Sequence, residues 1–97
     1  VVFLSTTGDV LDYPQQNAFK RFIQAGGGYV GIHAAADTEY DWWWYGKLVG
    51  AYFLSHPQQQ NAKLVAQPSE AFKQNVPEPW ERFDEWYNYK KISPDLN

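Results

Sequence analysis

Two short apolar runs on either side of one amphipathic helix constrain this chain most. The runs cover residues 1–4 and 29–33, and a capped helical pattern lies between them. A crossover of about two dozen residues is what two parallel strands need, whereas antiparallel strands can be joined by a short turn. Because parallel sheets are covered on both faces, the order strand, helix, strand predicts an α/β layered fold in which both runs are buried.

The helix between the runs is marked at both ends. Asp12 is a typical N-cap residue, Gln15 three positions later completes a capping box, and Pro14 suits the first turn. Gly26 is placed to end the helix. The sequence therefore predicts where this helix begins and where it ends.

Shorter elements are predicted in the rest of the chain. Periodicity and turn residues indicate a short helix over 43–50, a half-exposed strand over 62–66, a helix starting at 68 and an aromatic-rich strand over 83–89. Pro57 stops the apolar stretch that begins at Ala51.

Composition limits the classes of protein that fit. The 97 residues allow one domain, and five Trp, seven Tyr and six Phe must fill much of its core. The lack of Cys excludes a disulfide framework and a thiol nucleophile. With eight basic against eleven acidic residues and no basic stripe, we expect no nucleic-acid partner. No apolar run approaches the ~20 residues that a membrane span requires.

Both ends of the sequence read as the edges of a larger unit. The chain starts inside an apolar run without Met or a cap, and residues 92–97 are turn-like. We therefore expect residues 1–97 to be the central part of a single domain, truncated at both ends. Unpaired strand edges would then promote self-association.

His33 and His56 are the two histidines, and each lies where an apolar run meets a loop. Ligand sites in parallel α/β sheets lie at the carboxyl ends of strands, so we expect both histidines in one cleft. Each alone also fits a hydrogen-bonded structural role. Together with Glu85 they suit general acid–base chemistry on a sugar; metal binding is an alternative, although their spacing matches no compact metal motif.

Loops and aromatic residues add candidate sugar contacts. Thr7 and Asp37 lie in the loops after the two apolar runs, where hydroxyl and carboxylate groups can bind a polyol. Trp43 or Trp44 is expected to face outward and to stack on a sugar ring, whereas core filling is the alternative for most aromatics. Only one of Asp84 and Glu85 can face the cleft, because neighbours on a strand point to opposite faces.

Three motifs, in order and spacing, resemble the trehalose-utilisation (ThuA-like) family. They are residues 26–38, 46–57 and 84–87, and the resemblance runs from Val1 to about Lys91. It implies a flavodoxin-like three-layer fold of the class I glutamine-amidotransferase-like superfamily, with a mostly parallel sheet, of which this chain is an incomplete piece.

The resemblance also implies which residues share the cleft. They are His33, His56, Asp84 and Glu85, with Asp37 and Tyr87 close by. His33 stands where amidotransferase relatives carry a nucleophilic Cys, so glutaminase chemistry is excluded. Trp43 replaces a proline expected at its position.

Three functions remain open on these grounds. The leading one is a domain that binds or processes trehalose or a related sugar, with His33, His56 and Glu85 as catalytic residues. The substrate-binding residues would be Thr7, Asp37, Trp43, Trp44, Asp84 and Tyr87. The alternatives are a catalytically inactive carbohydrate-binding or interaction domain of a larger protein, and a metal-dependent hydrolase. The family occurs in bacterial sugar-utilisation clusters and in exported proteins; no cofactor, reaction or compartment follows from the residues.

Overall fold

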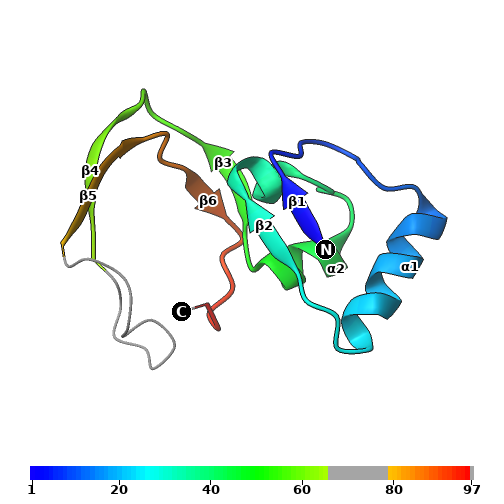
Figure 1. Cartoon of the computed structure of the whole chain (residues 1–97). Helices are drawn as coiled ribbons and strands as arrows, with labels where there is room; N and C mark the ends of the chain where they lie inside the picture. Colours follow the sequence, from blue (N-terminus) through cyan, green and yellow to red (C-terminus); the bar gives the residue numbers. More distant parts are fainter. Residues whose placement is uncertain (66–78, 97) are drawn as a thin grey trace.

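The computed structural model describes residues 1–65 and 79–96, which contain both helices and strands (Figure 1). Its elements, in order, are β1 (Val2–Leu4), α1 (Tyr13–Gln24), β2 (Val30–Ile32), the 3-10 helix η1 (His33–Asp37), α2 (Trp43–Val49), β3 (Tyr52–Ser55), β4 (Gln60–Leu64), β5 (Trp80–Asp84) and β6 (Asn88–Lys90). The helix expected from residue 68 lies outside the described residues. Within the described part, no helix is both long enough and apolar enough to span a bilayer.

The predicted strand, helix, strand unit is confirmed. β1 and β2 pair in parallel, with Val2 opposite Val30, and α1 forms the connection. The expected capping box is present: the Asp12 carboxylate accepts from the Gln15 backbone N–H at 2.8 Å, and the Gln15 side chain accepts from the Asp12 N–H at 2.8 Å.

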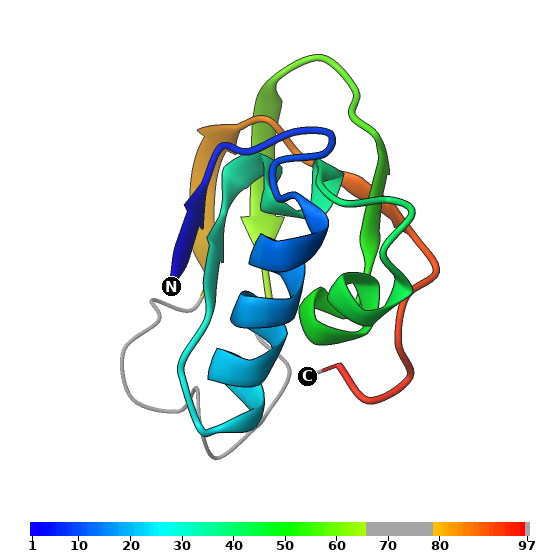
Figure 2. The ribbon, with the colours of Figure 1, turned by 90° about the vertical axis from the view of Figure 1, so that its right-hand side faces the viewer.

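Aromatic side chains form the core between this unit and α2, as the composition requires. The Phe3 ring of β1 stacks on Phe19 of α1 and on Tyr45 of α2, with ring centroids 5.5 Å apart in both pairs. Tyr45 is fully buried, and its hydroxyl donates to the Ala35 carbonyl at 2.7 Å. Figure 2 shows α1 lying alongside the two parallel strands, with α2 next to it.

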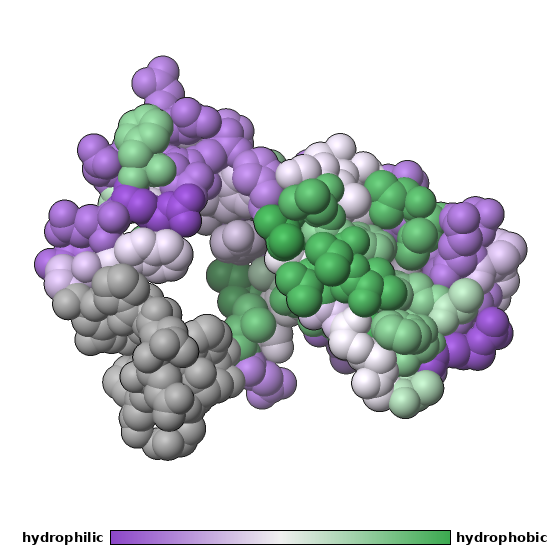
Figure 3. All heavy atoms as spheres, in the orientation of Figure 1, coloured by the Kyte–Doolittle hydropathy of each residue, from purple (hydrophilic) through white to green (hydrophobic). Residues whose placement is uncertain are grey.

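The opposite face of the parallel pair is exposed, and the expectation that both strands are buried is wrong for the described residues. Side chains alternate along a strand, so Phe3 points toward α1 while its neighbours point away. Val2, Leu4, Val30 and Ile32 are between 44% and 65% exposed. Figure 3 shows an apolar patch over β1 and β2. No described element covers this face.

The remaining strands form two antiparallel pairs. β3 pairs with β6, and β4 pairs with β5 along its whole length, from Gln60 opposite Asp84 to Leu64 opposite Trp80. The prediction of a single strand over 83–89 is wrong, because β5 ends at Asp84 and β6 begins at Asn88. β5 pairs with β4, whereas β6 pairs with β3, so residues 85–87 between β5 and β6 form a loop. The strand expected over 62–66 begins earlier, at Gln60.

A buried carboxylate ties the loop after β1 to the turn after η1. Glu39 is 1% exposed, and its Oε1 accepts the backbone N–H groups of Val10 and Leu11 at 2.9 and 2.8 Å. Its Oε2 accepts from Gln16 Nε2 at 2.7 Å. These three donors satisfy a charge that would otherwise be costly to bury. Glu39 therefore fixes the approach of the chain to α1.

Replacing Glu39 with Ala is expected to lower the free energy of unfolding by about 2–4 kcal/mol, because it removes the buried acceptor of three hydrogen bonds, from the backbone N–H groups of Val10 and Leu11 and from the Gln16 side chain. Urea-induced unfolding followed by circular dichroism measures this. Glu81→Ala, on the exposed surface of β5, is the matched control and should change the value by less than about 0.5 kcal/mol. Equal effects of the two substitutions would contradict the role assigned to Glu39.

Candidate functional site

His33 and His56 lie on either side of one carboxylate. Glu85 Oε2 is 3.5 Å from His33 Nε2, and Glu85 Oε1 is 3.8 Å from His56 Nδ1. The Tyr87 ring contacts both imidazole rings, with centroids 5.4 Å from His33 and 6.0 Å from His56. We refer to these four residues as the histidine cluster. The structure thus brings together, at one place, residues that are up to 54 positions apart in the sequence.

Strand ends place each member of the histidine cluster. His33 directly follows β2 and is the first residue of η1, and His56 directly follows β3. Glu85 and Tyr87 lie in the loop between β5 and β6. Because β3 pairs with β6, the end of one strand brings His56 next to the start of the other.

The backbone of His33 is in an uncommon conformation. Its φ is 57°, in the left-handed region that residues other than Gly rarely occupy. This conformation turns the chain from β2 into η1. Such backbone strain persists only where the surrounding structure imposes it, and it is concentrated at functional sites.

Tyr87 packs against both histidines and against Phe53. Its ring packs edge-on against Phe53 at 4.6 Å, and its hydroxyl lies 3.3 Å from His33 Nδ1. Burial, followed by the hydrogen bond and charge of Glu85, raises the pKa of Tyr87 to about 12. Tyr87 therefore presents a neutral hydroxyl to its neighbours.

Asp37 lies beside the cluster and is held by Tyr40. The Tyr40 hydroxyl is 2.5 Å from Asp37 Oδ1 and 3.1 Å from the Phe53 carbonyl. Burial and the hydrogen bond to Asp37 raise the pKa of Tyr40 to about 12. The negative charge of Asp37 also contributes to the raised pKa of Tyr87. Asp37 is thus a second carboxylate whose charge acts on Tyr87.

Asp84 and Trp44 make their contacts outside the cluster. Asp84 is held by Arg82 at 2.7 Å and accepts the Glu85 backbone N–H at 2.9 Å, so of the acidic pair it is Glu85 that meets the histidines. Thr7 is exposed in the loop after β1. Trp44 packs into the core, with its ring 5.0 Å from Trp42.

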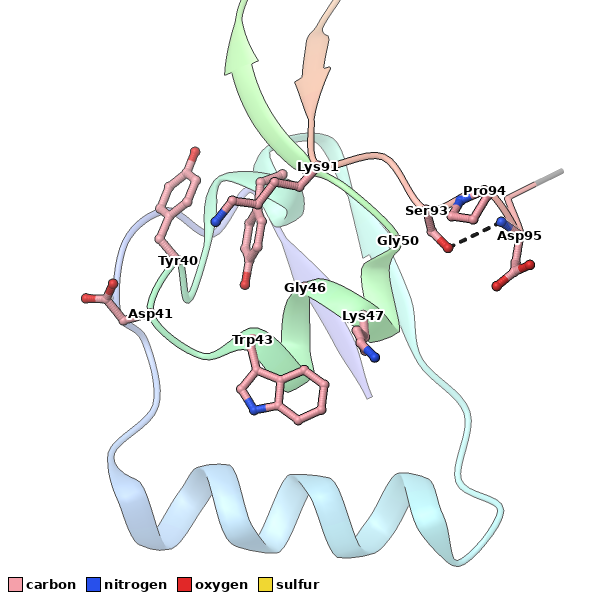
Figure 4. Close-up of a pocket in the computed structure, with 11 residues that line it drawn as sticks. Tyr40, Asp41, Trp43, Gly46, Lys47, Gly50, Lys91, Ser93, Pro94 and Asp95 are labelled. Atoms are coloured by element: carbon pink, nitrogen blue, oxygen red, sulfur yellow. Dashed lines mark hydrogen bonds between the residues drawn. The ribbon is translucent and has the colours of Figure 1, made fainter.

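Trp43 is the outward-facing tryptophan, at 65% exposure, but it borders a different cavity. This cavity of about 700 Å³, which we call the Trp43 pocket, lies between α2 and the segment after β6 (Figure 4). It is lined by Tyr40, Asp41, Trp43, Gly46, Lys47, Gly50, Tyr52, Lys91, Ser93, Pro94 and Asp95. The histidine cluster is not part of this lining. His33 instead borders a smaller, mainly apolar cavity of about 260 Å³.

The chemistry available at the cluster is hydrogen bonding and proton transfer. Within residues 1–65 and 79–96, no group of three or more His, Cys, Asp or Glu side chains is arranged to hold a metal ion. Two imidazoles, a carboxylate and a neutral phenol instead supply both donors and acceptors.

Sequence reasoning did not identify Glu39, Tyr40 or Phe53. Glu39 is an ordinary acidic loop residue in the sequence, and its burial depends on donors from residues 10, 11 and 16. Phe53 was visible only as part of an apolar run. The positions of Tyr40 and Phe53 depend on contacts over long separations that no local pattern encodes.

The raised tyrosine pKa values predict a loss of stability in alkaline solution. Ordinary tyrosine has a pKa of 10.0, and Tyr40 and Tyr87 in the folded chain have values of about 12. The unfolded chain therefore loses these protons first, so the free energy of unfolding should fall as the pH rises from about 10 to about 12. Tyr87→Phe should reduce that fall. Unfolding at several pH values, with tyrosinate absorbance, measures it; an unchanged fall in this variant would contradict the assignment.

Comparison with known proteins places the chain in a family. A search of curated proteins and a search of solved structures each found no match. A family model described as trehalose utilisation, ThuA, matches residues 1–97, which is the whole chain. The chain therefore belongs to the ThuA family.

Proposed function

We propose that the histidine cluster binds a neutral sugar, and that this is how the chain serves trehalose utilisation. The observation that carries the proposal is the position of Glu85 between two imidazoles, at 3.5 and 3.8 Å. The ThuA family match over the whole chain supports a carbohydrate as the ligand.

The cluster complements a sugar in its polar groups. Sugar hydroxyls both donate and accept hydrogen bonds. Glu85 offers acceptors, the Tyr87 hydroxyl offers a donor, and each imidazole offers one of each when neutral. The rings of Tyr87 and Phe53, 4.6 Å apart, supply an aromatic surface for the C–H groups of a sugar ring. The carboxylates of Glu85 and Asp37 disfavour an anionic ligand.

If the chain also processes its sugar, His56 is the better general base. Its Nδ1 lies 2.9 Å from the Pro57 carbonyl, which can only accept, so we assign the proton to Nδ1. The Nε2 lone pair is then free to take a proton from a sugar hydroxyl. His33 differs, because Tyr87 and Glu85 both lie against its ring nitrogens. We therefore propose that His33 orients the sugar.

We also propose that the chain is part of a flavodoxin-like, glutamine-amidotransferase-like domain. The parallel pair of β1 and β2 joined by α1 is the repeating unit of such folds. The exposed apolar face of that pair is what a further layer would cover. In this fold, the histidine cluster would lie at the carboxyl ends of the strands.

Titration of the protein with glucose and trehalose, followed by NMR, tests the proposed sugar site. We expect binding in the micromolar to millimolar range, with the largest shifts at His33, His56 and Tyr87. Glu85→Gln should weaken binding at least about tenfold, because it removes charged hydrogen bonds worth about 1.5–3 kcal/mol each.

Asp84→Asn is the matched control. It makes the same change at the neighbouring residue, whose carboxylate is held by Arg82 instead. It should leave sugar binding unchanged. Sugar binding by Glu85→Gln with the affinity of the parent would overturn the assignment of the site.

A further inference from the structure

We propose that the Trp43 pocket is a second binding site, separate from the histidine cluster, for a neutral polyhydroxylated ring such as a hexose. The pocket has a volume of about 700 Å³, in the range of small-molecule sites. Its lining comes from α2, the turn after η1, the start of β3 and the segment after β6, so it does not include the loop that carries Glu85.

Hydrogen bonds hold the walls of the Trp43 pocket in place. The Tyr52 hydroxyl is 3.1 Å from both the Glu39 and the Trp42 carbonyls. On the other side, the Ser93 backbone N–H donates to the Gly50 carbonyl at 2.7 Å, which ties the segment after β6 to the end of α2. A ligand would therefore meet a largely preformed cavity, and binding would cost little ordering of the chain.

The exposed aromatic surface of the pocket comes from Trp43, and the Tyr40–Tyr52 pair, in which Tyr52 is 5% exposed, forms another part of the lining. Trp43 is 65% exposed, although aromatic side chains elsewhere in α2 pack into the core. Tyr40 and Tyr52 stack with centroids 5.1 Å apart. Figure 4 shows the Trp43 ring at the edge of the pocket, near Lys47. The Lys47 ammonium lies 4.8 Å from the Trp43 ring centroid and makes a cation–π contact with one face of the indole.

The charges that line the pocket are balanced. Lys47 and Lys91 supply donors, and Asp41 and Asp95 supply acceptors. A phosphate or carboxylate would meet two acidic side chains as well as two basic ones, and would gain little net attraction. A neutral ligand with many hydroxyls can use both kinds of group and can place its C–H face on an aromatic ring.

NMR of the indole N–H groups tests this site directly. The Trp43 signal is identified by its loss in Trp43→Ala. In the parent protein, titration with glucose across the millimolar range should shift that signal. In His33→Ala the Trp43 signal should shift with unchanged affinity, because the histidine cluster is a separate site. A missing Trp43 shift in the parent protein would overturn the proposal, whereas a missing shift at His33 alone would overturn only the sugar site at the histidine cluster.

Stacking predicts the size of the effect when the ring is removed. Trp43→Ala should lower the affinity for glucose about tenfold, as measured from the glucose-induced shifts of the other pocket residues. Trp80→Ala is the matched control, since it removes an exposed tryptophan of β5 that does not line the pocket, and it should leave that affinity unchanged. Unchanged affinity in Trp43→Ala would contradict the proposal. Glucose 6-phosphate distinguishes a neutral ligand from an anionic one. If it binds about tenfold more tightly than glucose, the proposal of a neutral ligand is overturned.

Discussion

The buried carboxylate of Glu39 is the interaction on which the described fold depends most. It accepts from two backbone N–H groups of the loop after β1 and from Gln16 of α1, so one side chain joins three parts of the chain. Next to it, the buried Thr38 hydroxyl donates to the Thr6 carbonyl at 2.7 Å. Together they hold the loops after β1 and after η1 against each other. The end of η1 at Asp37 and the turn that carries Tyr40 are fixed in this way. The Tyr40 hydroxyl then bonds to Asp37 and to the Phe53 carbonyl of β3.

The histidine cluster is a consequence of how the strands change partners. β5 pairs with β4 and β6 pairs with β3, so the loop between β5 and β6 passes the end of β3. That loop carries Glu85 and Tyr87 to the two histidines, which stand at the ends of β2 and β3. The left-handed backbone of His33 and the edge-on contact of Tyr87 with Phe53 then set the geometry. Each feature is local, but their meeting depends on pairings between distant segments.

Local signals predicted the fold well where they were strong. The capping box at Asp12 and Gln15 and the helix ended by Gly50 follow from short-range chemistry, and the parallel pairing of the first two strands follows from the length of the crossover between them. The break at residues 85–87 did not, because an aromatic-rich run looks the same whether it forms one strand or two. For the site, the positions of His33 and His56 at strand ends indicated a shared location. The separation of Trp43 from that location depends on the packing of α2, which no spacing in the sequence reveals.

The ring signals of the two histidines in Glu85→Gln report directly on whether one carboxylate joins both imidazoles in a single site. If Glu85 lies between them at 3.5 and 3.8 Å, removing its charge should shift the ring-proton NMR signals of His33 and His56 together. Asp84→Asn, which alters the carboxylate that Arg82 holds, should shift neither. A Glu85→Gln spectrum in which only one histidine moves, or neither does, would contradict the shared site.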